Sequence, residues 1–180
     1  MESSMNKIFP TLSWQWVIAI VLLLAFSRLI PHPPNFTPLV AMAIYAGASL
    51  KDVKLAFIIP FLGLAISDAI IGLHSTMIFV YSAFAITIAA SFLWLKTFKI
   101  TTMTIAAVSA SLLFFLVTNF GAWLTHEMYP KTFEGLIQAY IAGIPFFKNT
   151  LSSTLLFLAL SLFASVYIVR RQHAQNKQSY

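Results

Sequence analysis

Residues 53–73 read VKLAFIIPFLGLAISDAIIGL, and residues 75–95 read STMIFVYSAFAITIAASFLWL. Lys54 and Asp68 are the only residues with a formal charge in these two stretches. Each stretch is about as long as the roughly 20 apolar residues that a membrane-spanning helix requires. They therefore predict two membrane helices, joined tightly around Gly72–His74.

The composition of the whole chain extends this interpretation. Of its 180 residues, 59% are hydrophobic and only 9% are charged, and the mean hydropathy is +0.86. A soluble domain carries about 25% charged residues, so most soluble enzyme classes are excluded. There are no cysteines, which excludes disulfides, thiol catalysis, iron–sulfur clusters and Cys-based zinc sites. We expect a single transmembrane domain over residues 1–180.

Further apolar runs on both sides complete an all-α integral membrane fold. Thr37 and Pro38 provide an N-cap and a first-turn proline for the second run. Residues 132–146 are apolar but too short and broken to span, and they predict either a re-entrant segment or an amphipathic loop on the interface. Six transmembrane helices are predicted, at residues 14–30, 37–50, 53–73, 75–95, 104–125 and 149–169.

The distribution of lysine and arginine predicts the orientation. Eight lie on the side of both termini: Lys7, Lys51, Lys54, Lys96, Lys99, Arg170, Arg171 and Lys177. Three lie on the opposite side: Arg28, Lys131 and Lys148. By the positive-inside rule, both termini are cytoplasmic. The excess of lysine and arginine over acidic residues is therefore explained by the orientation of the protein in the membrane, and we expect no binding to nucleic acid.

Polar residues gather at the predicted outer ends of the spans. Asp68 lies inside an apolar run, roughly 8 Å from its outer end by the helical rise. A carboxylate at that depth is costly unless it is paired or hydrated. It either contacts a substrate or cation at the mouth of a cavity, or it pairs with Arg28 or caps the turn at Gly72–His74.

Other outer residues also allow two interpretations. Asn119 can form a hydrogen bond to a ligand or to a neighbouring helix. Trp123 can line a pocket or belong to the interfacial aromatic belt. His32 and His74 come from different loops on one side, but two histidines without a defined spacing are weak evidence for a metal site. We therefore predict no metal and no cofactor.

The sequence contains no motif for catalysis. It lacks HExxH, a Gly-rich phosphate loop, a nucleophile elbow and a paired acidic metal motif. A membrane enzyme that acts on lipid or isoprenoid through His126, Glu127 and Asp68 is conceivable but has no motif behind it. The prediction is that the protein is not an enzyme and cannot hydrolyse ATP itself.

Several of these features resemble a known group of transporters. Six spans, a proline-rich outer loop ending Asn35-Phe36-Thr37-Pro38, and a third span ending Ser67-Asp68 before a turn resemble the S components of energy-coupling factor transporters. With Thr118-Asn119-Phe120-Gly121-Ala122-Trp123, Tyr129-Pro130 and Ile144-Pro145-Phe146-Phe147, they look more closely like a family of uncharacterised bacterial membrane proteins related to those S components.

The resemblance implies a binder of a vitamin-like small molecule in the bacterial inner membrane, in contact with lipid. The ligand would enter from outside and be moved by reorientation of the protein, with energy from a separate ATPase module or without one. The alternative is a scaffold or assembly subunit without a ligand, in which the same residues lock helix ends together. The residues expected to line the outward pocket are Arg28, Asn35, Asp68, His74, Asn119 and Trp123.

Overall fold

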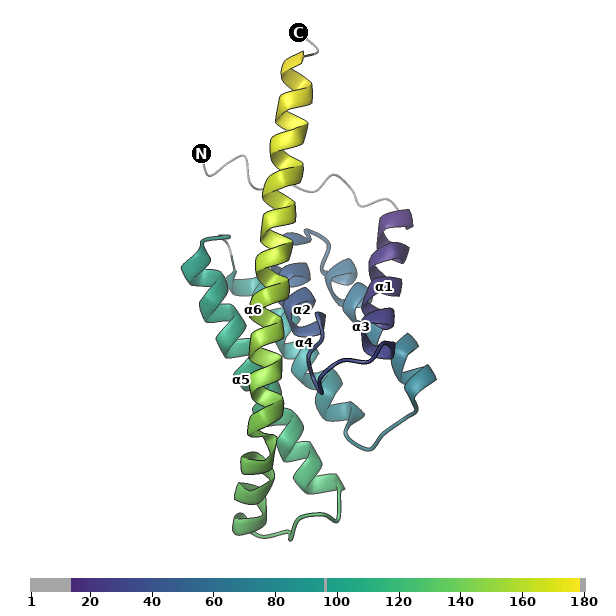
Figure 1. The fold of residues 1–180 in the computed structure, drawn as a ribbon, viewed down its shortest axis with the longest axis vertical. Coiled ribbons are helices and arrows are strands. Elements are labelled where there is room, and N and C mark those ends of the chain that lie inside the picture. The colour runs from purple at the N-terminus through teal and green to yellow at the C-terminus, as the bar shows by residue number, and fades with distance from the viewer. Residues whose placement is uncertain (1–13, 96, 179–180) are drawn as a thin grey trace.

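The computed structural model describes residues 14–95 and 97–178, and these residues form helices and no strand (Figure 1). This confirms the predicted all-α class. Lys7 and Lys96, which entered the charge count, lie outside the described residues. The helices are α1 (Trp14–Leu29), α2 (Leu39–Ser49), α3 (Val53–Ile71), α4 (Met77–Trp94), α5 (Ile100–Thr125) and α6 (Phe133–Gln178).

Four helices are long and apolar enough to cross a membrane: α3, α4, α5 and the part of α6 at Phe133–Tyr167. Large apolar side chains are exposed on the outside of the bundle, among them Leu23, Ile78 and Phe163. Such a surface is unstable in water but suits lipid tails. The protein is therefore a multi-pass membrane protein, while the predicted number of six crossings goes beyond these four helices.

The short helix α2 forms the centre of the bundle. It packs against α3, α4, α5 and α6, and seven of its 11 residues are buried. Its alanines and glycine allow close approach, because small residues let helix backbones come together. The Tyr45 hydroxyl also shares a hydrogen bond with Ser165 Oγ on α6. At the helical rise, α2 is only about 17 Å long, well short of a membrane core of about 30 Å.

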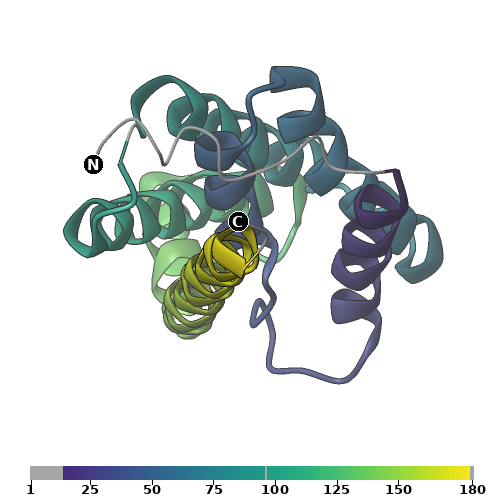
Figure 2. The ribbon, with the colours of Figure 1, turned by 90° about the horizontal axis from the view of Figure 1, so that it is seen from above.

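The remaining helices pair around this centre. α1 packs against α3, and α5 packs against both α4 and α6. A Cβ at Gly63 of α3 would lie 2.8 Å from Leu24 Cβ, so α1 and α3 are in close contact there. The connection at residues 30–38 leaves α1 and crosses toward α6 before it enters α2 (Figure 2).

The break that was predicted at residues 132–146 is absent, because α6 runs without interruption from Phe133 to Gln178. Pro145 removes one backbone hydrogen bond, at a cost of about 3 kcal/mol. Packing against α5 offsets this cost: the Tyr140 and Phe147 rings both contact Phe115. The last span therefore has no break before residue 149, and the C-terminal end of α6 projects beyond the other helices (Figure 1).

Two helix starts also differ from the prediction. α2 begins at Leu39 with Pro38 at the N-cap position, so Thr37 does not cap it, and no side chain bonds the helix end. α5 begins at Ile100 rather than residue 104, because the helix includes polar Thr101 and Thr102. Hydropathy locates the apolar core of a span, whereas the helix itself continues through polar residues at the interface.

Gly47 provides a test of the α2–α4 contact. A Cβ there would lie 2.6 Å from the Ile88 carbonyl oxygen and 2.7 Å from Ser91 Cβ. Helix propensity favours alanine over glycine by about 1 kcal/mol, but overpacking typically costs about 1–3 kcal/mol. We expect Gly47→Ala to lower the free energy of unfolding, measured by SDS titration in mixed micelles. The control is Ala19→Gly at an exposed position of α1, which measures the difference in helix propensity between alanine and glycine without the close contact. A stabilised Gly47→Ala protein would contradict the close packing.

Candidate functional site

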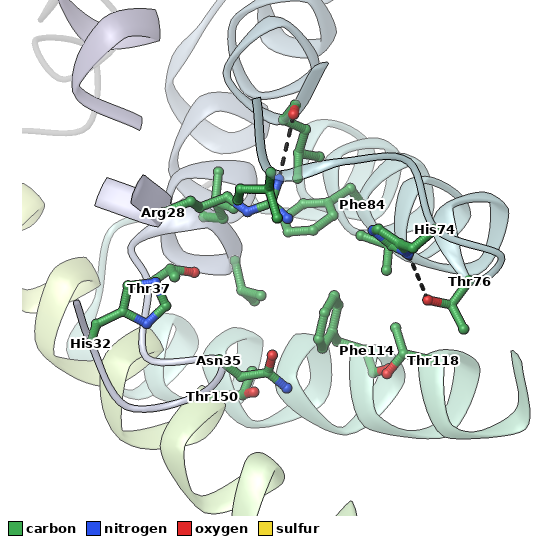
Figure 3. A pocket seen from close by; sticks show the side chains of 15 residues that line it. Arg28, His32, Asn35, Thr37, His74, Thr76, Phe84, Phe114, Thr118 and Thr150 are labelled. Carbon is green, nitrogen blue, oxygen red and sulfur yellow. Dashed lines mark hydrogen bonds between the residues drawn. The ribbon is translucent and has the colours of Figure 1, made fainter. Parts of the chain in front are cut away.

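A cavity of about 330 Å³ lies where the predicted outer ends of the helices meet (Figure 3). Ligand pockets typically occupy about 300–1,000 Å³, so it is large enough for a small molecule. Every helix and the connection at residues 30–38 contribute side chains to it. The polar lining residues are Arg28, His32, Asn35, Thr37, His74, Thr76, Thr118 and Thr150, and the apolar ones are Leu39, Val40, Leu64, Ile71, Val80, Phe84 and Phe114.

Arg28 reaches the cavity from the end of α1 and is held by α3. Its Nη1 lies 2.5 Å from Asp68 Oδ1 and donates to Ser67 Oγ at 2.6 Å. The Asp68 side chain is 1% exposed and that of Arg28 is 17% exposed. The Tyr81 hydroxyl donates to the second oxygen of Asp68 at 3.0 Å. Of the alternatives for Asp68, the structure contains the ion pair with Arg28, and Asp68 itself does not line the cavity.

The other edge of the Arg28 guanidinium is available to a ligand. Nη1 also approaches the Leu64 carbonyl oxygen at 3.4 Å. Within residues 14–95 and 97–178, no acceptor bonds Nε or Nη2. Arg28 therefore has one edge anchored to the protein and one edge without a protein partner.

Two histidines lie at different sides of the cavity (Figure 3). His32 Nδ1 donates to the Pro33 carbonyl at 2.8 Å, so Nε2 is the ring nitrogen that remains for another partner. His74 Nδ1 lies 2.8 Å from Thr76 Oγ1. In the part of the chain that the structure describes, no group of three His, Asp or Glu side chains is positioned to hold a metal.

Asn35 belongs to a connection that is tied to α6. Its φ of 62° is in the left-handed region, which asparagine tolerates better than most residues. Asn149 Nδ2 donates to the Pro34 carbonyl at 2.9 Å, and Ser153 Oγ donates to the Asn35 carbonyl at 3.5 Å. The Asn35 side chain is exposed and extends into the cavity (Figure 3).

The structure places Asn119 and Trp123 away from the cavity. Asn119 Nδ2 donates to the Phe115 carbonyl at 2.7 Å, and its side chain packs against Gly143 of α6 so closely that a Cβ there would lie 2.7 Å from Asn119 Cγ. Trp123 Nε1 donates to the Pro130 carbonyl at 2.8 Å. Both residues fasten the end of α5 to the following loop and to α6.

Three of the six predicted site residues thus meet at the cavity: Arg28, Asn35 and His74. His126 and Glu127, considered for a membrane enzyme, lie in the exposed loop after α5 and do not line the cavity with them. Sequence reasoning missed the wall formed by Phe84 and Phe114, whose rings pack edge to face at 5.6 Å. One available signal was that Phe114 and Thr118, four residues apart, share a helix face.

A helical multi-pass membrane protein with a cavity at one end of its bundle is the class that these features define. The chain belongs to the family of unknown function DUF6580, whose family model matches residues 10–177. No curated protein and no solved structure matches the chain.

The Arg28–Asp68 pair makes a prediction about stability. Arg28→Met leaves a buried carboxylate without its cationic partner, which typically costs about 3–5 kcal/mol. Adding Asp68→Asn removes that charge, so the double variant should recover part of the loss. SDS titration in mixed micelles measures the unfolding free energies of the single and double variants. If the double variant loses as much unfolding free energy as the two single variants together, the two side chains are not coupled.

Proposed function

We propose that the protein is the substrate-binding component of a membrane transporter, and that it takes up a vitamin-like small molecule. The observation that carries this proposal is the cavity, where Arg28, Asn35 and His74 converge above an apolar wall. A few convergent polar groups on a mostly apolar surface are typical of small-molecule sites. The resemblance to S components of energy-coupling factor transporters supports the same function.

The proposal includes six crossings in a bacterial inner membrane, with both termini in the cytoplasm and the cavity facing outward. The charge distribution supports this orientation. α3, α4, α5 and residues Phe133–Tyr167 of α6 are long enough to cross a membrane, whereas α1 and α2 are shorter apolar helices. Transport would proceed by reorientation in the bilayer, with an ATPase module of the energy-coupling factor type as partner or by the protein alone.

A second candidate function is a scaffold or assembly subunit without a ligand. The specific observation in its favour is that Asp68, Asn119 and Trp123 all bond the protein itself. These contacts lock helix ends together, as a scaffold requires. They do not account for the cavity or for the unpaired edge of Arg28, so we rank the transporter component first.

Filling the cavity tests the choice between the two functions. We expect native mass spectrometry of the gently purified protein to detect a co-purified small molecule, because side chains from every helix line the cavity. Val80→Trp places an indole in the cavity and should abolish the bound mass. The matched control is Ile78→Trp on the same helix, where the side chain is 72% exposed and faces away, and it should retain the mass. Absence of any bound molecule in the wild-type protein would favour the scaffold.

The orientation can be measured directly because the chain has no cysteine of its own. Glu127 and Lys51 are both exposed, in loops that we assign to opposite sides of the membrane. We expect Glu127→Cys to react with a membrane-impermeant maleimide in spheroplasts, and Lys51→Cys to react only after permeabilisation. The reverse labelling pattern would place the cavity on the cytoplasmic side and contradict uptake.

A further inference from the structure

We propose that the ligand of this cavity is a small monocarboxylate with an apolar body, and that its carboxylate binds Nε and Nη2 of Arg28. This inference rests on the proposed function, since it names the class of molecule that the same cavity binds. Four features carry it: the geometry of Arg28, the end of α2, the charges around the cavity and its aromatic wall.

Arg28 presents the donor pair that a carboxylate requires. Asp68 and Ser67 accept from Nη1, so the anchored edge is already occupied. Nε and Nη2 form the other edge of the planar group, and two parallel N–H groups match the two oxygens of a carboxylate. A neutral amide offers one acceptor oxygen and would leave one of these donors unpaired. The free edge therefore discriminates between the two groups.

The N-terminus of α2 adds positive potential to the same cavity. Leu39 and Val40 line the cavity, and both are almost completely buried. In the residues that the structure describes, no group accepts a hydrogen bond from the main-chain N–H groups of Leu39, Val40 and Ala41, and no side chain caps the helix. Unpaired N–H groups and the helix dipole favour an anion at this position. They support the binding of a carboxylate but not of a cation.

The charges around the cavity favour a single negative charge on the ligand. Asp68 neutralises Arg28, and no Asp or Glu lines the cavity to attract a cation. His32 and His74 line different sides of the cavity (Figure 3), so both can bond polar substituents of the ligand. A ligand with several negative charges would exceed the compensation that one paired arginine and one helix end provide.

The aromatic wall determines the remainder of the molecule. Phe84 and Phe114 pack edge to face and, with Val80, form an apolar surface in the cavity. A flat ring or short aliphatic body buries its surface there, which favours binding by roughly 25 cal/mol per Å² of apolar area. The cavity volume of about 330 Å³ is near the lower limit for ligand pockets and limits the body to about one ring.

Matched ligand pairs test this class. Benzoate with benzamide, and nicotinate with nicotinamide, share a ring and differ in the charge of one planar group. Isothermal titration of the full-length protein in detergent, at pH 7, gives the affinity of each member. We expect the carboxylate to bind at least about tenfold more tightly than its amide in each pair that binds, which corresponds to about one charge-assisted hydrogen bond.

Two variants link this preference to the cavity. Arg28→Lys keeps the charge opposite Asp68 but removes the planar donor pair, so carboxylate affinity should fall about tenfold or more. Asn35→Asp is nearly isosteric, tolerates the same backbone conformation, and adds a negative charge to the cavity. It should weaken carboxylate binding about tenfold and lower the preference for the carboxylate over its amide. Since the Asn35 side chain bonds no other described residue, this variant should fold normally even if Arg28→Lys does not.

The outcomes separate this inference from the proposed function. If amides bind as tightly as carboxylates, or if Asn35→Asp leaves carboxylate affinity unchanged, the ligand class is wrong although a ligand site exists. If no member of any pair binds with a dissociation constant below about 10 mM, the monocarboxylate class is also rejected. Mass spectrometry then distinguishes the two failures: a bound neutral or cationic molecule preserves the transporter function, and no bound molecule removes both.

Discussion

The ion pair between Arg28 and Asp68 is the constraint on which the site depends. A carboxylate that is 1% exposed in an apolar helix requires a cationic partner, and the end of α1 provides it. Because α1 packs mainly on α3, the pair also determines how α1 is positioned beside the remainder of the bundle. The same contact that satisfies Asp68 therefore brings the guanidinium to the cavity and fixes the direction of its free edge.

The short length of α2 explains why a cavity exists next to that guanidinium. α2 begins only at Leu39, so the chain between the end of α1 and this residue continues as irregular backbone. Irregular backbone at membrane depth is tolerated only where protein buries it or where it lines a cavity. Here Asn149 and Ser153 of α6 bond the carbonyls of Pro34 and Asn35. Side chains of the longer neighbouring helices line the cavity that lies beside the buried end of α2 and the bonded connection.

Hydropathy was sufficient to predict the helical class and the approximate positions of the first five helices, because long apolar runs have few alternatives in a membrane. It was not sufficient at residues 132–146, where Gly143 and Pro145 indicated a break but contacts with α5 outweighed them.

The candidate site was predicted in part. Arg28, Asn35 and His74 are polar residues at span ends, and such residues stand out in an apolar sequence. Asn119 stands out equally and yet packs on Gly143, because polarity does not indicate which neighbour a helix face meets. Phe84 and Phe114 could not be identified for the same reason, since every span contains similar side chains.

The anchored guanidinium also affects how a ligand would bind. A free arginine loses rotamer entropy when it is immobilised, and each such side chain costs about 0.5–1.5 kcal/mol on association. Asp68 and Ser67 already hold Arg28 in place, so this cost is met during folding rather than during binding. The neutral pair also reduces the long-range attraction that a bare cation would exert, which lowers affinity for anions that fit poorly. Recognition then depends on the direction of two N–H groups and on the shape of the aromatic wall, so specificity in this cavity arises from geometry more than from net charge.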